Sequence, residues 1–278
     1  MSRTYYCEKP IIEKALDKLK ADGLVAQEAS FNYDAPQNLR SEVAYRDFDF
    51  LSRLSRIGEM ETTQSILNWL KETGIAPETA VFNSTAFEAL QKEVKEKFVI
   101  AGTSISPVMA LLLYLLSTIK QPQRIIGLGT YYGYALVWAV GASCGLHKIY
   151  NAEAVLGIDI DESATKQAQQ NFSQLANAEH IALLTEDGLE AVEKLEGPFD
   201  YVYLDVDSKE VGKGLYLKLL QRLYAKIAPA GWVLAHDTVV PPFAKQLKPY
   251  LAFVRDNQYF AESISFHVDA FGLELSIK

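Results

Sequence analysis

The chain has 278 residues, of which 49% are apolar and 22% are charged, and its formal net charge at pH 7 is −8. A chain of this length can bury a full hydrophobic core, and its composition is that of an ordinary globular protein in water. Nucleic-acid binding usually needs a basic face, so the negative charge argues against a nucleic-acid partner.

The cysteines and the apolar runs indicate the cellular compartment of the protein. Cys7 and Cys144 are too few for a disulfide framework and fit a reducing compartment. No charged segment followed by an apolar run, typical of a secretory signal, opens the sequence. The run 107–119 is shorter than the roughly 20 residues that a membrane helix needs, and glycines and tyrosines interrupt the run 125–143. We therefore expect a cytoplasmic protein with no membrane partner.

Residues 1–99 are expected to form a helical N-terminal extension. Apolar residues recur at helical spacing in the stretches 11–19, 51–70 and 87–94. Between the first two stretches, residues 26–38 contain Asn, Asp and Pro and are typical of a loop. The apolar stripes of such helices can cover a pocket or form a dimer interface.

From residue 106 the pattern changes to a helix followed by alternating strands and helices. This alternation predicts an α/β fold with a parallel sheet that is covered on both faces. Near the C-terminus the runs 262–268 and 272–278 have no helix between them, which predicts an antiparallel hairpin at the edge of the sheet. The strands expected before this hairpin are 124–128, 154–159, 180–185, 199–205 and 231–236.

A glycine-rich turn follows the first of these strands, in the stretch 124–133 with the sequence Arg-Ile-Ile-Gly-Leu-Gly-Thr-Tyr-Tyr-Gly. Glycine lets the main chain approach a ligand closely, and the helix that follows offers free N–H groups. Asp159 ends the second strand, where a carboxylate can accept hydrogen bonds from both hydroxyls of a ribose. It lies beyond the roughly 20 residues of a dinucleotide fingerprint. The late position of Asp159 and the terminal hairpin count against an NAD-binding enzyme, which stays an alternative.

Three later segments, 199–207, 227–238 and 272–278, complete an ordered set of motifs. Together with the glycine turn and Asp159, this set resembles the small-molecule O-methyltransferases of the catechol and caffeoyl-CoA type. The resemblance covers about residues 100–278 and implies a Rossmann-like class I methyltransferase domain. It also implies S-adenosylmethionine as the cofactor, a small-molecule acceptor and a homodimer.

The resemblance assigns a cofactor site residue by residue. The glycine turn would cradle the methionine part of the cofactor, Asp159 would bind the ribose, and Asp187 would lie near the adenine amino group. From the residues alone, Asp159 could instead be a neighbour of the helix cap Asp161, and Ser106 with Pro107 could simply begin a helix. The implied cofactor-binding residues are Gly129, Thr130, Tyr131, Gly133, Asp159, Ile160, Asp187 and Asp205.

Asp205 and Asp237 each end a predicted strand, at the edge where open parallel sheets bind ligands. Two carboxylates brought together there either share a proton or hold a hard cation. The metal-dependent members of the resembled family have an Asn after the second Asp, where this chain has Thr238, a poorer ligand. The implied metal set is Asp205, Asp237 and Thr238 with Mg²⁺ or Ca²⁺, and metal dependence stays open.

The catalytic positions also depart from the family pattern. Ser208 stands where the family has a lysine, Lys209 is shifted by one residue, and Gly127 replaces the acid that usually ends the first strand. His236 could act as a general base, or it could be structural and point away from Asp237 on a regular strand. The candidate catalytic residues are His236, Asp237 and Lys209.

Two alternatives to a metal-assisted O-methyltransferase remain besides the NAD-binding enzyme. One is a metal-independent enzyme that uses S-adenosylmethionine and has another acceptor, such as a nitrogen. The other is a non-catalytic protein that keeps the cofactor pocket, because the departures at Gly127, Ser208 and Thr238 are those that a decayed catalytic site would show.

Overall fold

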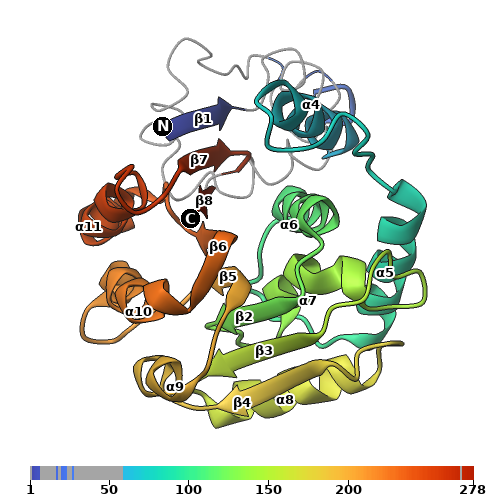
Figure 1. Ribbon diagram of the computed structural model, residues 1–278. Helices are drawn as coiled ribbons and strands as arrows, with labels where there is room; N and C mark the ends of the chain where they lie inside the picture. Colours follow the sequence, from blue (N-terminus) through green and yellow to red (C-terminus); the bar gives the residue numbers. More distant parts are fainter. Residues whose placement is uncertain (1, 7–16, 18–19, 24–26, 28–58, 270) are drawn as a thin grey trace.

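A computed structural model describes residues 2–6, 17, 20–23, 27, 59–269 and 271–278 (Figure 1). Its described part contains one eight-stranded sheet in the order β1-β7-β8-β6-β5-β2-β3-β4. The helix predicted at 11–19, the loop predicted at 26–38 and the first part of the stretch 51–70 lie largely outside the described residues.

Five parallel strands, β6-β5-β2-β3-β4, form one side of the sheet with β4 at its edge, and they confirm the predicted α/β alternation. The inner strands β2 and β5 are apolar and almost wholly buried, as expected of strands covered on both faces, whereas the edge strand β4 is partly exposed. The arrowheads of β2, β3 and β4 in Figure 1 point to one edge, where the loops that carry the candidate site residues begin. The strands are β2 (Arg124–Leu128), β3 (Ala154–Asp159), β4 (Ile181–Thr185), β5 (Phe199–Leu204) and β6 (Ile227–His236), which begins at Ile227 rather than at residue 231.

The C-terminal hairpin is confirmed, but it does not form the edge of the sheet. β7 (Glu262–His267) and β8 (Leu273–Ile277) are antiparallel, and β8 also pairs antiparallel with β6. β1 (Ser2–Tyr6) then adds in parallel to β7 and becomes the outer strand. The expectation of a helical extension over residues 1–99 is wrong for this strand, whose partner β7 lies at the other end of the chain. Tyr5 fixes it by packing against the rings of Trp69 and Phe266.

Helices cover both faces of the sheet, and the sheet separates two hydrophobic cores. Successive residues of one strand point to opposite faces, so Tyr203 contributes to one core and Leu204 to the other. The first face carries α4 (Glu59–Glu72), α5 (Ser84–Lys97), α6 (Pro107–Lys120), α7 (Tyr134–Val140) and α8 (Glu162–Ser173). The second carries α9 (Gly188–Lys194), α10 (Leu215–Leu223) and α11 (Ala244–Val254). Short 3₁₀ turns are η2 (Gly141–Ser143), η3 (Gly212–Gly214), η4 (Tyr224–Lys226) and η5 (Pro241–Phe243).

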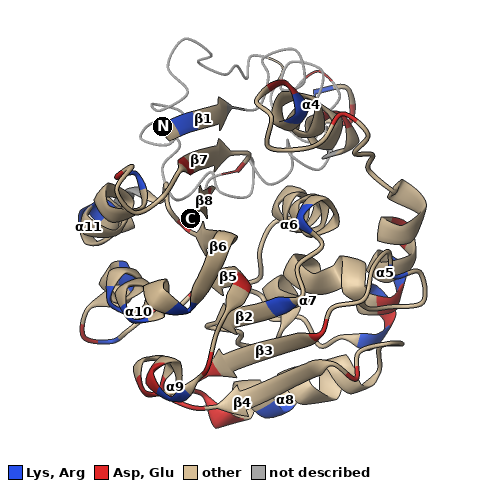
Figure 2. Cartoon of the chain, viewed as in Figure 1, with Lys and Arg blue, Asp and Glu red and all other residues tan. Residues whose placement is uncertain are grey.

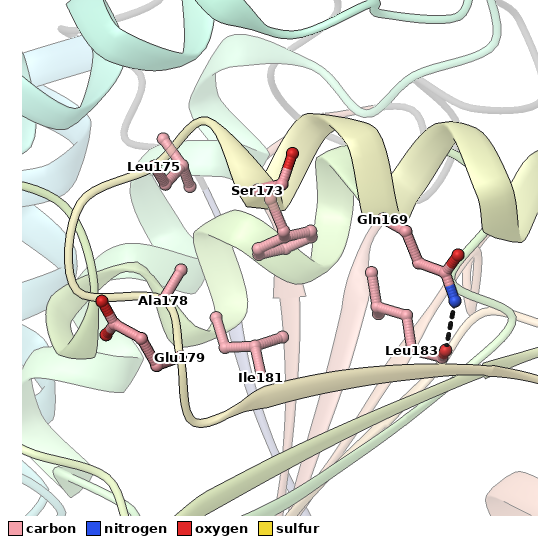
Figure 3. A pocket seen from close by; sticks show the side chains of 8 residues that line it. Gln169, Ser173, Leu175, Ala178, Glu179, Ile181 and Leu183 are labelled. Atoms are coloured by element: carbon pink, nitrogen blue, oxygen red, sulfur yellow. Dashed lines mark hydrogen bonds between the residues drawn. The ribbon is translucent and has the colours of Figure 1, made fainter.

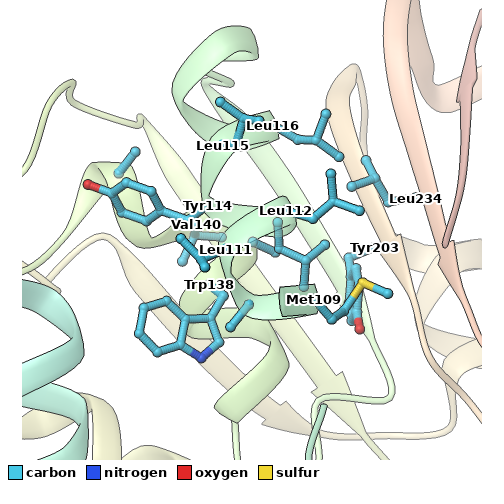
Figure 4. Packing of buried hydrophobic residues seen from close by; sticks show 14 of the residues in the cluster. Met109, Leu111, Leu112, Tyr114, Leu115, Leu116, Trp138, Val140, Tyr203 and Leu234 are labelled. Carbon is cyan, nitrogen blue, oxygen red and sulfur yellow. The ribbon is translucent and has the colours of Figure 1, made fainter. Parts of the chain in front are cut away.

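Helix α6 is buried along most of its length, and Figure 4 shows its side chains reaching neighbours on both sides. Met109 lies beside Tyr203, while Leu111 and Tyr114 lie on the side of Trp138. The helix begins as the sequence predicts, because the Met109 amide donates to the hydroxyl of the cap Ser106, and Pro107 follows. A helix that is apolar all round belongs in a protein core or a membrane. Among the described helices, none is both long and apolar enough to cross a membrane.

Candidate active site

A pocket of about 340 Å³ opens where β2, β3, β4 and β5 end. In open parallel sheets this edge is the usual place for a ligand. Six of the predicted cofactor residues line it, namely Gly129, Tyr131, Asp159, Ile160, Asp187 and Asp205. Ser208, which stands where the resembled family has a lysine, also lines the pocket. The remaining lining residues, which the sequence analysis did not single out, are Leu128, Ile158, Glu186, Gly188, Val206, Asp207 and Leu215.

The turn after β2 brings the main chain against the loop that follows β5. Gly129 has a φ of 82°, and a β-carbon there would lie 2.2 Å from the carbonyl oxygen of Asp205. Only glycine fits this contact. Tyr131 also has a positive φ, of 46°, which is a strained conformation for a residue with a side chain. Backbone strain of this kind is often found at ligand-binding sites, and Tyr131 lines the pocket.

The Asp159 carboxylate is fixed by two backbone amides. Its Oδ2 atom accepts a hydrogen bond of 2.7 Å from the Tyr131 amide, and its Oδ1 atom accepts one of 2.9 Å from the Asp161 amide. Each carboxylate oxygen has about two lone-pair sites, so both oxygens can still accept from ligand hydroxyls. Asp161, in contrast, caps α8 by accepting from the Ala164 amide. The structure confirms Asp161 as the cap that the sequence analysis expected.

Thr130 and Gly133 do not line the pocket. The Thr130 side chain is buried, and its methyl group lies against Gly157 of β3. Gly133 caps α7 in the left-handed conformation. Gly127, which replaces the family's acid, faces Leu136, where an added β-carbon would come within 2.8 Å of the leucine Cδ1 atom. These residues shape the turn and its packing rather than the pocket wall.

The far wall of the pocket is acidic. Asp187 accepts hydrogen bonds from the amides of Leu189 and Glu190, so it caps α9 while it also lines the pocket. Glu186 and Asp207 add further carboxylates to the wall. Figure 2 shows acidic residues gathered at α9 and at the adjoining end of β4. A pocket with this charge favours a ligand that carries a positive group.

Next to the pocket, Asp205 and Asp237 meet around a lysine that the sequence analysis missed. Lys213 Nζ lies 2.9 Å from Asp205 Oδ1 and 2.7 Å from Asp237 Oδ2. It also donates to the Tyr216 hydroxyl at 3.2 Å. An ammonium has three N–H groups, so each of them has an acceptor. The predicted Lys209 is instead exposed in the loop after β5.

The loop after β5 explains why Lys213, and not Lys209, reaches the carboxylates. The Ser208 hydroxyl accepts from the amides of Glu210 and Val211, which turns the chain back toward the sheet. Gln246 of α11 then accepts from the Lys213 amide at 2.7 Å. Lys213 lies four positions beyond the predicted Lys209 in the sequence. Its place beside the carboxylates could not be recognised without the turn at Ser208.

The charges of this cluster stabilise one another. Burial disfavours the charged lysine, but the carboxylates of Asp205 and Asp237 outweigh it and raise the pKa of Lys213. Burial likewise disfavours the charged Asp205 carboxylate, but Lys213 and His236 outweigh it and lower the pKa of Asp205. Lys213 is therefore an ammonium and Asp205 a carboxylate throughout the neutral range.

His236 belongs to the same cluster. Its Nδ1 atom lies 3.3 Å from Asp205 Oδ2 and 3.5 Å from Asp237 Oδ1, and its ring stacks on Phe271. A regular strand would point His236 and Asp237 apart, but Asp237 has a φ of 62°, which ends the strand and brings both side chains together. Burial lowers the pKa of His236, but the two carboxylates prevail and raise it to about 9. The raised pKa favours the charged imidazolium at neutral pH.

The carboxylates do not fit a divalent cation while Lys213 is in place. Asp205, His236 and Asp237 offer ligand atoms within 4.8 Å of one another, close enough for a metal site. Magnesium and calcium need oxygens at about 2.0–2.6 Å, and the lysine ammonium already bridges the two carboxylates. Thr238 is buried, and its hydroxyl has no hydrogen-bond partner among the described residues.

A second hollow, of about 260 Å³, lies between α8 and β4 and is shown in Figure 3. Polar and apolar atoms share its walls, and Gln169 donates a hydrogen bond of 2.8 Å to the carbonyl of Leu183 on β4. None of its lining residues belongs to the cluster of Asp205, Lys213, His236 and Asp237, and Glu179 is the one ionisable residue among them.

Known proteins resemble the region that forms this site. Residues 126–238 match a family model described as a methyltransferase domain. A ribosomal protein L11 methyltransferase from Syntrophotalea carbinolica is 33% identical over 117 residues, which cover 42% of this chain and 33% of that protein. A catechol O-methyltransferase from Niastella koreensis is 26% identical over 108 residues, covering 37% of this chain and 46% of that protein. The matched part thus spans less than half the length of these curated relatives.

Solved structures share most of the fold at low identity. The SAH-bound methyltransferase PaMTH1 from Podospora anserina superposes with a TM-score of 0.53 at 15% identity, covering 78% of this chain and 96% of that one. The cofactor-bound protein Rv0187 from MTB gives a TM-score of 0.54 at 17% identity, with coverages of 72% and 92%.

The sheet order, the glycine turn and these superpositions define the class: the chain has the fold of the S-adenosylmethionine-dependent methyltransferases. Residues 126–238, which match the methyltransferase-domain model, carry the pocket turn, Asp159 and the Asp205–Asp237 cluster.

Proposed function

We propose that the chain binds S-adenosylmethionine in the 340 Å³ pocket and transfers its methyl group to an oxygen of a small molecule. The observation that carries this proposal is the Asp159 carboxylate, which two backbone amides hold at the pocket wall. A carboxylate fixed in this way is suited to the two hydroxyls of a ribose. The resemblance of the sequence and the matches to methyltransferases support the same reading.

The shape and charge of the pocket support a cofactor of this kind. Ligand pockets usually measure about 300–1,000 Å³, and this one lies within that range. S-adenosylmethionine has a positive sulfonium and a positive amine, which the carboxylates of Asp159, Glu186, Asp187 and Asp207 would attract. When bound, the cofactor supplies an electrophilic methyl group on a good leaving group.

For methyl transfer, the main task of the protein would be to align the acceptor oxygen with the methyl group of the cofactor. The acceptor oxygen would form its bond to the methyl carbon as the carbon–sulfur bond breaks, which would release S-adenosylhomocysteine, and the proton of the acceptor hydroxyl would pass to solvent water. Asp205 lines the cofactor pocket and also belongs to the cluster of Lys213, His236 and Asp237. The acceptor would therefore be held between pocket and cluster, and such positioning can supply about 7–11 kcal/mol of the barrier.

The organisation of the whole chain belongs to the same proposal. Residues 1–99, whose β1, α4 and α5 belong to the common sheet and core, would cover the acceptor site or form a homodimer interface, and residues 100–278 would carry the methyltransferase chemistry. The acidic composition and the absence of a framework of cysteines support a cytoplasmic enzyme with a small-molecule substrate.

Calorimetric titration with S-adenosylhomocysteine tests the cofactor site. We expect binding by the unaltered chain and at least tenfold weaker binding by Asp159→Ala. Glu153→Ala is the matched control, because Glu153 is an exposed acid at the other end of β3. If the folded chain does not bind the ligand, or if both variants bind as the unaltered chain does, the proposal fails.

Radiolabelled methyl transfer to panels of hydroxyl and amine acceptors then tests the reaction. Transfer to hydroxyl compounds supports the proposed function, whereas transfer to amines alone would replace it with N-methylation. Cofactor binding without any transfer across the panels would favour a non-catalytic binding protein.

A further inference from the structure

We propose that the Lys213 ammonium is a built-in replacement for the divalent cation that metal-dependent relatives use, so that the site is assembled without a metal. This inference concerns the same site as the proposed function and relies on it for its meaning in catalysis. The inference that Lys213, and not a metal ion, lies between Asp205 and Asp237 can be tested without measuring activity.

The contacts of Lys213 are those of a resident cation. Its ammonium bridges one oxygen of each carboxylate, at 2.9 and 2.7 Å, and its third proton goes to the Tyr216 hydroxyl at 3.2 Å. Tyr216 in turn donates to the carbonyl of His236, at the end of β6. The lysine thus connects the loops after two neighbouring strands, which is what a metal ion bound by both carboxylates would do.

The two carboxylates already have a cation between them. Asp205 and Asp237 contribute two negative charges, and the Lys213 ammonium lies within 2.9 Å of one oxygen of each. A divalent cation in the same place would have to displace the ammonium or add its own charge beside it in a nearly buried site, and either is strongly unfavourable.

Lys213 is also held in position by its surroundings. Its side chain is 5% exposed and lies over the rings of Tyr216 and Phe243, while Gln246 fixes its backbone amide. Swinging the ammonium away to admit a metal would break its ion pairs and leave a charged group without partners in a buried site. This cost opposes the exchange of the lysine for a metal ion.

The replacement has a consequence for the acceptor. A metal ion can hold two neighbouring oxygens of one substrate, because it has open coordination positions. All three N–H groups of Lys213 already have acceptors in the protein, so the ammonium cannot hold a substrate in this way. The acceptor therefore needs only one hydroxyl, and a pair of adjacent oxygens gives no advantage.

Manganese binding, followed by electron paramagnetic resonance on the chelator-treated full chain, tests the inference. We expect no stoichiometric binding of Mn²⁺ at about 1 mM by the unaltered protein. Lys213→Ala removes the ammonium and should bind one Mn²⁺ at least tenfold more tightly than the unaltered chain. The double variant Lys213→Ala/Asp237→Asn should lose that binding. Lys209→Ala is the matched control, since this exposed lysine lies in the same loop, and it should behave as the unaltered chain does.

Three results would overturn the inference: one Mn²⁺ bound by the unaltered chain and lost in Asp237→Asn, a folded Lys213→Ala protein that binds none, or binding by Lys213→Ala that persists in the double variant. If Lys213→Ala does not fold, the titration of the unaltered chain decides by itself. Titration of the same samples with S-adenosylhomocysteine separates the two proposals, because a failure to bind that ligand removes the proposed function and leaves the manganese result intact.

Discussion

The ammonium of Lys213 lies 2.7 Å from the carboxylate of Asp237, and this pair connects the loop after β5 to the end of β6. A 3₁₀ turn, a glutamine from α11 and two aromatic rings hold the lysine there. The same ammonium reaches Asp205, which lines the cofactor pocket. The stability of the cluster and the order of the pocket wall are therefore coupled.

Replacing Lys213 by methionine should destabilise the fold by about 3–5 kcal/mol, because two nearly buried carboxylates lose their partner. Chemical denaturation followed by circular dichroism measures this loss. Lys209→Met, in the same loop but exposed, should change stability by less than about 0.5 kcal/mol. Equal effects of the two changes would show that the ion pairs contribute little.

The stability of the protein should fall as the pH rises from about 6.5 to about 9. Folding raises the pKa of His236 to about 9, above its unfolded value of about 6.5. Its contribution is therefore fully present below pH 6.5 and is lost as the pH passes through the folded pKa, on the order of 3 kcal/mol in all. Urea unfolding at pH 6.5 and pH 9.5 should reveal this decrease, and His236→Gln should flatten it. A slope that is unchanged in the variant would assign the pH dependence to another group.

Gly129→Ala should weaken binding of S-adenosylhomocysteine by at least tenfold and lower stability by about 1–3 kcal/mol. An added β-carbon would lie 2.2 Å from the Asp205 carbonyl oxygen, and the φ of 82° is unfavourable for alanine. The control is Gly102→Ala, since a β-carbon at Gly102 meets nothing within 4 Å and this glycine has no positive φ. Calorimetry and thermal unfolding measure both effects, and normal binding by Gly129→Ala would mean that the turn can move away.

Tyr5→Ala should reduce stability by about 3–5 kcal/mol, as for other large aromatic residues removed from a core. Tyr5 is buried on β1, where it packs against Trp69 and Phe266 and donates to the Ser65 hydroxyl. Thr4→Ala, on the exposed face of the same strand, should have little effect. Hydrogen exchange of the β7 amides reports whether β1 protects this side of the sheet, and unchanged protection in Tyr5→Ala would contradict this role.

Much of the fold was open to prediction because its signals are local. Apolar runs of strand length alternate with helical patterns from residue 106 onward, and the parallel sheet, the start of α6 at Ser106 and the C-terminal hairpin follow from them. Strand β1 was not open to prediction, since its five residues gain their partner only from β7, at the other end of the chain. Because β1 and β7 are far apart in the sequence, the pattern also did not show that β1 covers the edge of the hairpin.

The sequence by itself determined the glycine turn, Asp159 at the end of its strand, and the two acids Asp205 and Asp237, because these residues follow strands whose ends must meet at one edge. Only the tertiary structure decided which cation lies between those acids. The turn at Ser208, the amide contact with Gln246 and the positive φ of Asp237 bring Lys213 and His236 to the carboxylates. Each of these depends on contacts between elements far apart in the chain, which no local pattern of residues records.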